Sequence, residues 1–160
     1  MLEKFSLDGK IVVITGGGTG LGLAMVRALA RAGANLVIAG RRSGPIEEAV
    51  REVKALGGDA LAVPTDVTDS GEVDRLVTTV LDHFGNIDVL INNAGAVQEN
   101  VRKPLWDITD DEWRLVMDVN LSGAFYCARG VSKPMADRGK GKIINVASGF
   151  GMRAGRDLYM

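Results

Sequence analysis

The chain has 160 residues, of which 46% are hydrophobic and 24% are charged, and its formal net charge is −1. These values are typical of one globular domain, and they exclude a disordered chain and a strongly basic nucleic-acid-binding protein. No apolar run reaches the length of a membrane span, and residues 1–10 lack the basic-then-apolar layout of a signal peptide. We therefore expect one domain over residues 1–160, located in the cytoplasm, with no nucleic-acid or membrane partner.

Short apolar runs alternate with longer helical stretches along the chain. The apolar runs predict strands over residues 10–15, 35–39, 60–64, 87–92 and 142–147. Helical spacing and end signals predict helices over residues 20–32, 45–56, 69–84 and 110–137. The order βαβαβαβαβ predicts an α/β fold, a Rossmann-like doubly wound parallel sheet with helices on both faces.

Several residues are expected to begin or interrupt these helices. Thr68 or Asp69 is a candidate N-cap for the third helix, and Thr109 with Glu112 predicts a capping box on the fourth. Pro134 is expected to kink the fourth helix or to end it one turn early.

The single cysteine and the single histidine limit the chemistry that these 160 residues can support. They exclude an intrachain disulfide, a thiolate metal cluster and a histidine-rich metal site. Cys127 lies in an apolar helical stretch and is interpreted as a small core residue. His83 lies near the end of a helix and is interpreted as a solvated residue.

A glycine-rich turn over residues 15–22 joins the first strand to the first helix. A doubly wound sheet binds the pyrophosphate of a dinucleotide at this turn, because glycine lets the backbone approach and the helix offers N–H groups. The spacing is TGxxxGxG rather than GxGxxG, and a tight turn without a ligand is the alternative interpretation. The residues expected to hold the pyrophosphate are Gly16, Gly18, Thr19, Gly20 and Leu21.

The second strand ends in Gly40, Arg41 and Arg42, where a dinucleotide-binding sheet often carries an acidic residue for the ribose 2′-OH of NAD. Two arginines instead suit the 2′-phosphate of NADP. We therefore predict NADP rather than NAD, with Arg41 as the first contact and Arg42 as the second. Ordinary surface charge at a strand end is the alternative.

Together these features resemble the short-chain dehydrogenase/reductase family in its classical form, over essentially the whole chain. The motifs that carry the resemblance are TGxxxGxG over 15–22, Asp66-Val67, Asn92-Asn93-Ala94-Gly95, Asn120 and Ser148. The resemblance implies an oxidoreductase that transfers hydride between nicotinamide and a ketone or secondary alcohol, and with the two arginines it predicts an NADP(H)-dependent one. It also implies a small-molecule substrate and a homodimer or homotetramer.

The resemblance assigns the remaining residues to the cofactor. Asp66 and Val67 are implied to bind the cofactor, with Asp66 at the adenine amino group, although Asp66 could instead begin a helix. Asn92 is implied to brace the sheet. The residues Asn93, Ala94 and Gly95 are implied to line the cofactor, and an ordinary turn is the alternative.

Two further residues are implied to act in the reaction. Asn120 would hold a water molecule in a proton relay, and Ser148 would hydrogen-bond the substrate oxygen. Asparagine is unfavourable inside a helix, so a kink or a freed carbonyl is expected at Asn120, with a side chain turned to solvent as the alternative. Ser148 could also simply open a loop.

The family's YxxxK motif is not complete in these residues, since Tyr159 is followed only by Met160. We therefore expect a piece of a longer protein that is inactive alone, with Tyr159 as the catalytic tyrosine or as a neighbour of it. A non-catalytic dinucleotide-binding module or partner subunit is the alternative function. Arg153 and Arg156 lean toward a polar or anionic substrate, and the fifth strand is expected to be an apolar sheet edge.

Overall fold

The computed structural model describes residues 5–96 and 104–149, and strands and helices alternate along them in the predicted order. The elements are β1 (Ile11–Thr15), α1 (Gly20–Arg31), β2 (Asn35–Gly40), α2 (Ser43–Ala55), β3 (Ala60–Pro64), α3 (Ser70–Phe84), β4 (Val89–Asn92), the short helix η2 (Leu105–Asp107), α4 (Asp110–Met117), η3 (Asp118–Gly123), α5 (Ala124–Asp137) and β5 (Lys142–Asn145). No helix within these ranges is long and apolar enough to cross a membrane.

The five strands form one parallel sheet in the order β3-β2-β1-β4-β5. In its centre, Val13 of β1 is in register with Val37 of β2 and Leu90 of β4. Every residue of β1 is buried, because helices cover both faces of a central parallel strand. The strand order reverses between β1 and β4, and such sheets bind ligands beyond the carboxyl ends of the strands at this switch point.

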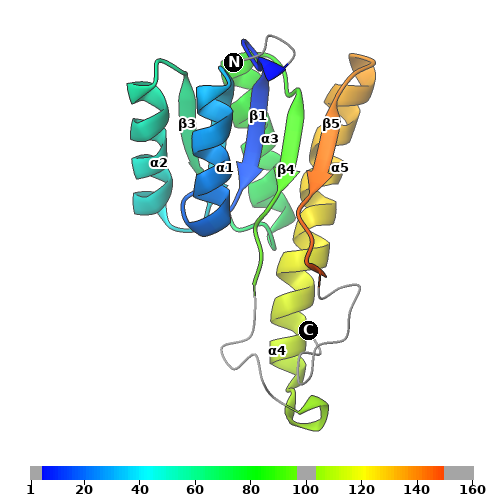
Figure 1. The fold of residues 1–160 in the computed structure, drawn as a ribbon. Coiled ribbons are helices and arrows are strands. Elements are labelled where there is room, and N and C mark those ends of the chain that lie inside the picture. The colour runs from blue at the N-terminus through cyan, green and yellow to red at the C-terminus, as the bar shows by residue number, and fades with distance from the viewer. Residues whose placement is uncertain (1–4, 97–103, 150–160) are drawn as a thin grey trace.

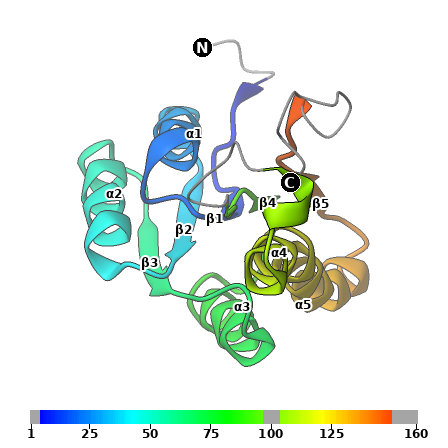
Figure 2. The ribbon, with the colours of Figure 1, turned by 90° about the horizontal axis from the view of Figure 1, so that it is seen from below.

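The helices form one layer on each face of the sheet, as Figures 1 and 2 show. Val12 and Ile14 of β1 belong to the core cluster that includes Val26 of α1 and Ile46 of α2. Their neighbour Val13 faces the other way, into the cluster that α3 and α5 complete. This alternation of side chains along one strand makes two apolar layers and confirms the doubly wound α/β fold.

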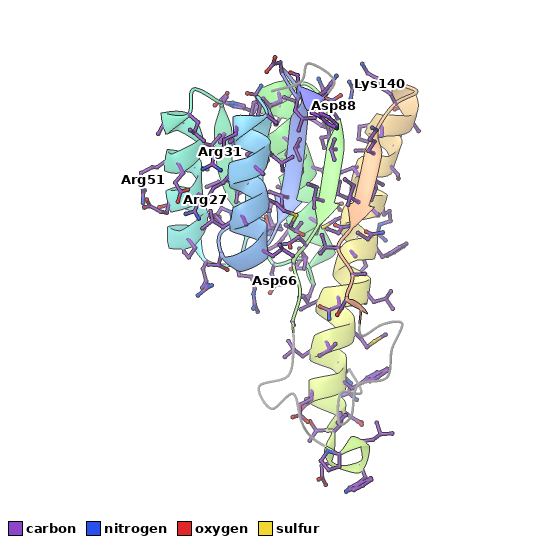
Figure 3. The ribbon with its side chains drawn as sticks, viewed as in Figure 1. Arg27, Arg31, Arg51, Asp66, Asp88 and Lys140 are labelled. Carbon is purple, nitrogen blue, oxygen red and sulfur yellow. The ribbon has the colours of Figure 1, made fainter. Side chains whose placement is uncertain are left out.

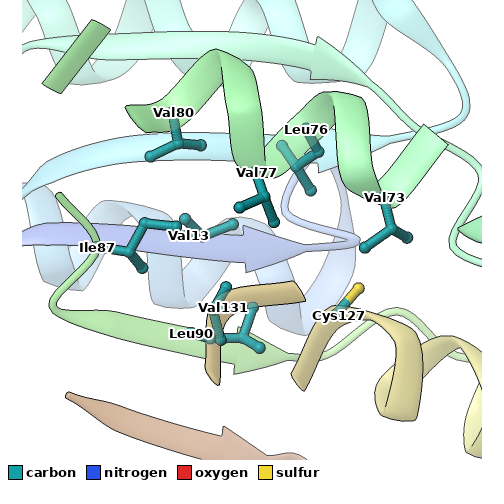
Figure 4. Close-up of a pocket in the computed structure, with 9 residues that line it drawn as sticks. All are labelled: Val13, Val73, Leu76, Val77, Val80, Ile87, Leu90, Cys127 and Val131. Carbon is teal, nitrogen blue, oxygen red and sulfur yellow. The ribbon is translucent and has the colours of Figure 1, made fainter. Parts of the chain in front are cut away.

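Apolar side chains fill the layer between the sheet and the helices α3 and α5 (Figure 4). Its side chains come from β1, β4, the loop before β4, α3 and α5, and there is no room among them for a water molecule. The residues are Val13, Val73, Leu76, Val77, Val80, Ile87, Leu90, Cys127 and Val131. Cys127 is therefore the core residue that the sequence predicts.

We expect Cys127 to resist alkylation by iodoacetamide in the folded chain and to react once urea unfolds it. Cys127 is 2% exposed, and burial raises the pKa of its thiol from 9.0 to about 11. This shift lowers the thiolate fraction at neutral pH about a hundredfold, and only the thiolate is a good nucleophile. A mass-spectrometric time course with and without urea measures the effect, and equal rates in both conditions would contradict the burial of this thiol.

The long helix predicted over residues 110–137 consists of two α-helices and an intervening π-helical turn. α4 begins with the predicted capping box: Glu112 N–H donates to Thr109 Oγ1 at 3.3 Å, and Thr109 N–H donates to the Glu112 carboxylate at 2.8 Å. The irregularity predicted at Asn120 is present as η3, whose backbone bonding follows the π pattern.

Pro134 does not end α5 one turn early, which corrects one of the expected alternatives. The helix continues to Asp137, with Pro134 inside it. Val131 and Met135 are buried on either side of the proline, and Lys133 Nζ donates to the Asp137 carboxylate at 2.8 Å. Packing and this local ion pair therefore hold the last turn in spite of the missing N–H.

The fifth strand is the predicted apolar edge of the sheet. β5 pairs with β4 on one side only, and Ile143 and Ile144 are 40% and 47% exposed. The strand ends at Asn145, two residues earlier than predicted. Val146 N–H nevertheless donates to the Asn92 carbonyl at 2.9 Å, which keeps the chain beside β4 as it leads to Ser148.

Candidate functional site

The glycine turn between β1 and α1 has a shape that only glycine adopts easily. Gly16 has φ +67° and Gly20 has φ +54°, both in the left-handed region. A Cβ on Gly22 would overlap the carbonyl oxygen of Gly16, so α1 approaches the turn as closely as a backbone can. Thr19, the N-cap of α1, makes no side-chain cap bond in the described structure, which leaves the first helical amides available to an anion.

The hydroxyl of Thr15 joins the glycine turn to the turn that follows β4. Asn93 N–H and Ala94 N–H donate to Thr15 Oγ1 at 3.1 and 3.0 Å. Asn93 Nδ2 donates in the opposite direction, to the carbonyls of Thr15 at 3.0 Å and Gly16 at 3.2 Å. The two turns therefore form one rigid unit, and the role of Thr15 was not predicted. A hydroxyl at the end of a fully buried strand was the available signal, since such a group needs partners.

Asn92 fastens β4 to its neighbours, as the family resemblance implies. Its side chain is 6% exposed, and Nδ2 donates to Asn145 Oδ1 at 2.9 Å and to the Ala124 carbonyl at 3.2 Å. These two bonds connect the carboxyl end of β4 to β5 and to the start of α5.

Asn120 binds the backbone of Ala96 through both ends of its amide. Ala96 N–H donates to Asn120 Oδ1 at 2.8 Å, and Asn120 Nδ2 donates to the Ala96 carbonyl at 3.0 Å. The Asn120 side chain is exposed, as the alternative expects, but it is bonded to the Ala96 backbone rather than directed only at solvent. The π-turn also brings Gly123 against Val67, where a Cβ would lie 2.7 Å from the Val67 methyl group.

Asp66 follows β3 at the carboxyl edge of the sheet (Figure 3). The backbone N–H of Thr68 donates to Asp66 Oδ1 at 3.0 Å, and the Thr68 hydroxyl donates to it at 2.8 Å. These bonds outweigh partial burial and, with the nearby Arg41 guanidinium, hold the pKa of the Asp66 carboxyl below its usual value. Asp69 caps α3 instead of Asp66 or Thr68, because its carboxylate accepts from the N–H groups of Gly71 and Glu72.

Arg41 and Arg42 directly follow β2 at the same edge of the sheet. Both side chains are exposed, and neither has an ion pair within residues 5–96 and 104–149. Arg41 lies close enough to Asp66 to affect its pKa. Two exposed guanidinium groups beside a phosphate-binding turn suit an anion.

These groups line one cleft of about 1090 Å³ at the carboxyl ends of the strands. This volume is at the upper end of the range for small-molecule sites. Its lining comes from all five strand ends and from η3. The predicted site residues that line it are Gly16, Gly18, Thr19, Leu21, Arg41, Arg42, Asp66, Val67, Asn93, Ala94, Gly95, Asn120 and Ser148. Gly20 shapes the turn without lining the cleft. Tyr159, Arg153 and Arg156 lie outside the described residues.

The described residues place neither a cluster of metal ligands nor a histidine at this cleft. They contain no group of three side chains from His, Cys, Asp and Glu that could hold a metal ion. His83 is exposed at the far end of α3, where Nε2 lies 3.3 Å from Asp59 Oδ2. Asp59 directly precedes β3 and so lies at the amino ends of the strands, whereas Ser148 follows β5 at their carboxyl ends. Ser148 and His83 are therefore not paired.

This chain is similar in sequence to known proteins of one family. A family model described as short chain dehydrogenase matches residues 10–159. The 3-oxoacyl-[acyl-carrier-protein] reductase of Synechocystis sp. is 39% identical over 148 residues, which cover 92% of this chain and 59% of the reductase.

Two solved structures show the same architecture. NAD⁺-bound xylitol dehydrogenase superimposes with a TM-score of 0.89 at 31% identity, over 98% of this chain and 58% of that one. A metagenomic short-chain oxidoreductase in complex with NADP superimposes with a TM-score of 0.88 at 32% identity, over 95% of this chain and 68% of that one. The chain thus spans about three-fifths of the length of the reductase and of xylitol dehydrogenase, and it belongs to the short-chain dehydrogenase family.

Proposed function

We propose that this chain is the dinucleotide-binding part of a cytoplasmic, NADP(H)-dependent oxidoreductase that acts on a ketone or secondary alcohol. One observation carries the proposal. A phosphate-binding glycine turn, two exposed arginines, Asp66 and Ser148 meet around a single cleft at the switch point of the sheet.

The residues around the cleft fit the parts of NADP in order. The glycine turn and the N-terminus of α1 would hold the pyrophosphate, since a Cβ at Gly22 would fill the space that the turn needs. Asp66 would accept from the adenine amino group, and Arg41 and Arg42 would bind the 2′-phosphate. The turn over Asn93, Ala94 and Gly95 would line the nicotinamide ribose.

The bound cofactor would supply or accept the hydride. The chain's own groups would orient the substrate and hold a proton path. The Ser148 hydroxyl would donate to the substrate carbonyl oxygen, which bears the developing negative charge during reduction. The Asn120 amide is occupied by Ala96, so the main-chain carbonyl of Asn120 would be the group that holds a water molecule.

The comparisons support the reaction class more strongly than the coenzyme. Both related enzymes named above act, by their names, on a carbonyl or an alcohol, and this supports hydride transfer to such a group. One structural neighbour binds NAD⁺ and another NADP, so the preference for NADP rests on Arg41 and Arg42. Exposed apolar side chains on α4 and α5, namely Trp113 and Phe125, support a homodimer or homotetramer.

NADPH fluorescence titration tests the proposal on the 160 residues, and NADPH oxidation with a panel of ketones tests it on the chain with any sequence that its gene encodes beyond Met160. We expect NADPH binding, and turnover that Ser148→Ala lowers about 10²–10³-fold while NADPH affinity stays the same. Ser132→Ala is the matched control, because this exposed serine donates only to a carbonyl of its own helix. Binding without turnover by any ketone would favour a non-catalytic module.

A further inference from the structure

The N-terminus of α3 has an unusual capping arrangement. Asp69 is the N-cap, so Glu72 occupies the third helical position, where a capping-box carboxylate accepts the N–H of the N-cap residue itself. In α3 that N–H already donates to the Asp66 carbonyl at 3.1 Å. The Glu72 carboxylate instead extends three residues further back and accepts from the backbone N–H of Asp66 at 2.6 Å.

The second capping site of the chain shows the ordinary form of this arrangement. In α4, Glu112 also stands at the third helical position, and its carboxylate accepts from the N–H of the N-cap Thr109 at 2.8 Å. The two glutamates therefore have the same place in a helix and the same kind of bond, but different targets. The target of Glu112 is its own helix end, whereas the target of Glu72 is the loop that lines the cleft.

The loop that Glu72 holds has few other attachments near Asp66. Thr65 N–H donates to the Gly40 carbonyl at 3.1 Å on one side, and Val67 is buried against Gly123 on the other. Between them, Thr68 orients the Asp66 carboxylate, the Asp69 N–H binds the Asp66 carbonyl, and Glu72 binds the Asp66 N–H. Glu72 does not line the cleft, so any effect on a ligand must act through Asp66.

We propose that Glu72 is a positioning residue for the adenine end of the cleft, an inference that rests on the proposed dinucleotide function. A hydrogen bond from a backbone N–H to a carboxylate is among the stronger bonds in proteins, and this one is half-buried. By fixing the backbone of Asp66, it fixes the direction in which the Asp66 carboxylate meets the adenine amino group. The ion pair of Glu72 with Arg75, at 3.4 Å on the surface, contributes little.

The test measures the affinity for 2′,5′-ADP, the adenine half of NADP, in variants of Glu72. We expect Glu72→Ala to bind about tenfold more weakly, because the bond to the Asp66 N–H is lost. Glu72→Gln keeps an acceptor oxygen at the same reach and is expected to restore most of the affinity. Glu72→Asp keeps the charge at the helix N-terminus but is one methylene too short, so it should fold well and bind as weakly as Glu72→Ala.

Glu112→Ala is the matched control, since it removes the same bond from the same helical position away from the adenine end. It should leave the 2′,5′-ADP affinity unchanged, as should Arg75→Ala. Hydrogen exchange of the Asp66 amide should accelerate in Glu72→Ala and Glu72→Asp but not in Glu72→Gln. Parental affinity in Glu72→Asp, or equal losses in Glu72→Ala and Glu112→Ala, would overturn the inference. Failure of the parent chain to bind NADPH at all would overturn the proposed function with it.

Discussion

Gly22→Ala is expected to abolish measurable NADPH binding and to lower the free energy of unfolding by about 1–3 kcal/mol. Gly22 lies in α1, where replacing glycine with alanine would ordinarily stabilise the helix by about 1 kcal/mol. The added Cβ, however, would overlap the Gly16 carbonyl and lie 2.7 Å from Asn93 Nδ2. Those two groups are bonded to each other at 3.2 Å, so neither can move without opening the glycine turn.

Gly130→Ala provides the comparison for Gly22→Ala. Gly130 also lies inside a helix, α5, and a Cβ there would meet only side-chain methyl groups, of Val77 at 3.0 Å and of Val73 at 3.6 Å, which can shift slightly. We expect this variant to keep NADPH binding and to change stability by less than about 1 kcal/mol. Urea unfolding and NADPH fluorescence titration measure both variants, and parental binding by Gly22→Ala would show that the close approach of α1 is not needed.

The sequence predicts the sheet and its helices well because their signals are local. The β-branched run over β1 and the glycines around α1 each specify a structure within a few residues. Pro134 shows the limit of such signals, since buried Val131 and Met135 hold the helix through it. The π-turn at Asn120 was anticipated only as an irregularity, because its form depends on the Ala96 backbone, 24 residues away.

The candidate site likewise contains residues that local motifs predict and bonds that they do not predict. The motifs predict the glycine turn over residues 15–22 and the turn over Asn92–Gly95, and both turns line the cleft, apart from Gly17 and Gly20. The bonds of Thr15 and Glu72 were not predicted. Thr15 meets residues 78 and 79 positions away, and Glu72 departs from the capping pattern that its own position favours.

Arg41→Ala is expected to weaken NADP⁺ binding about 10- to 100-fold and to leave NAD⁺ binding nearly unchanged. The guanidinium of Arg41 would make charge-assisted bonds to the 2′-phosphate, a group that NAD⁺ lacks. Asp66 lies on the same side of the cleft and is a carboxylate at neutral pH. Without Arg41 its negative charge is less compensated, which adds repulsion against the 2′-phosphate and none against the hydroxyl of NAD⁺.

Isothermal titration with both coenzymes at low and high salt measures this difference. The loss of NADP⁺ affinity should be larger at low salt, because salt screens exposed charges. Arg51→Ala is the matched control: it removes the same charge from the exposed surface of α2, where Arg51 pairs with Glu48, and it should affect the two coenzymes equally little. Arg42→Ala should also weaken NADP⁺ binding, but less than Arg41→Ala does. Equal losses of NADP⁺ and NAD⁺ affinity in Arg41→Ala would mean that this side chain contacts a part of the coenzyme that NADP⁺ and NAD⁺ share. The structural basis for a preference between the two coenzymes would then be lost.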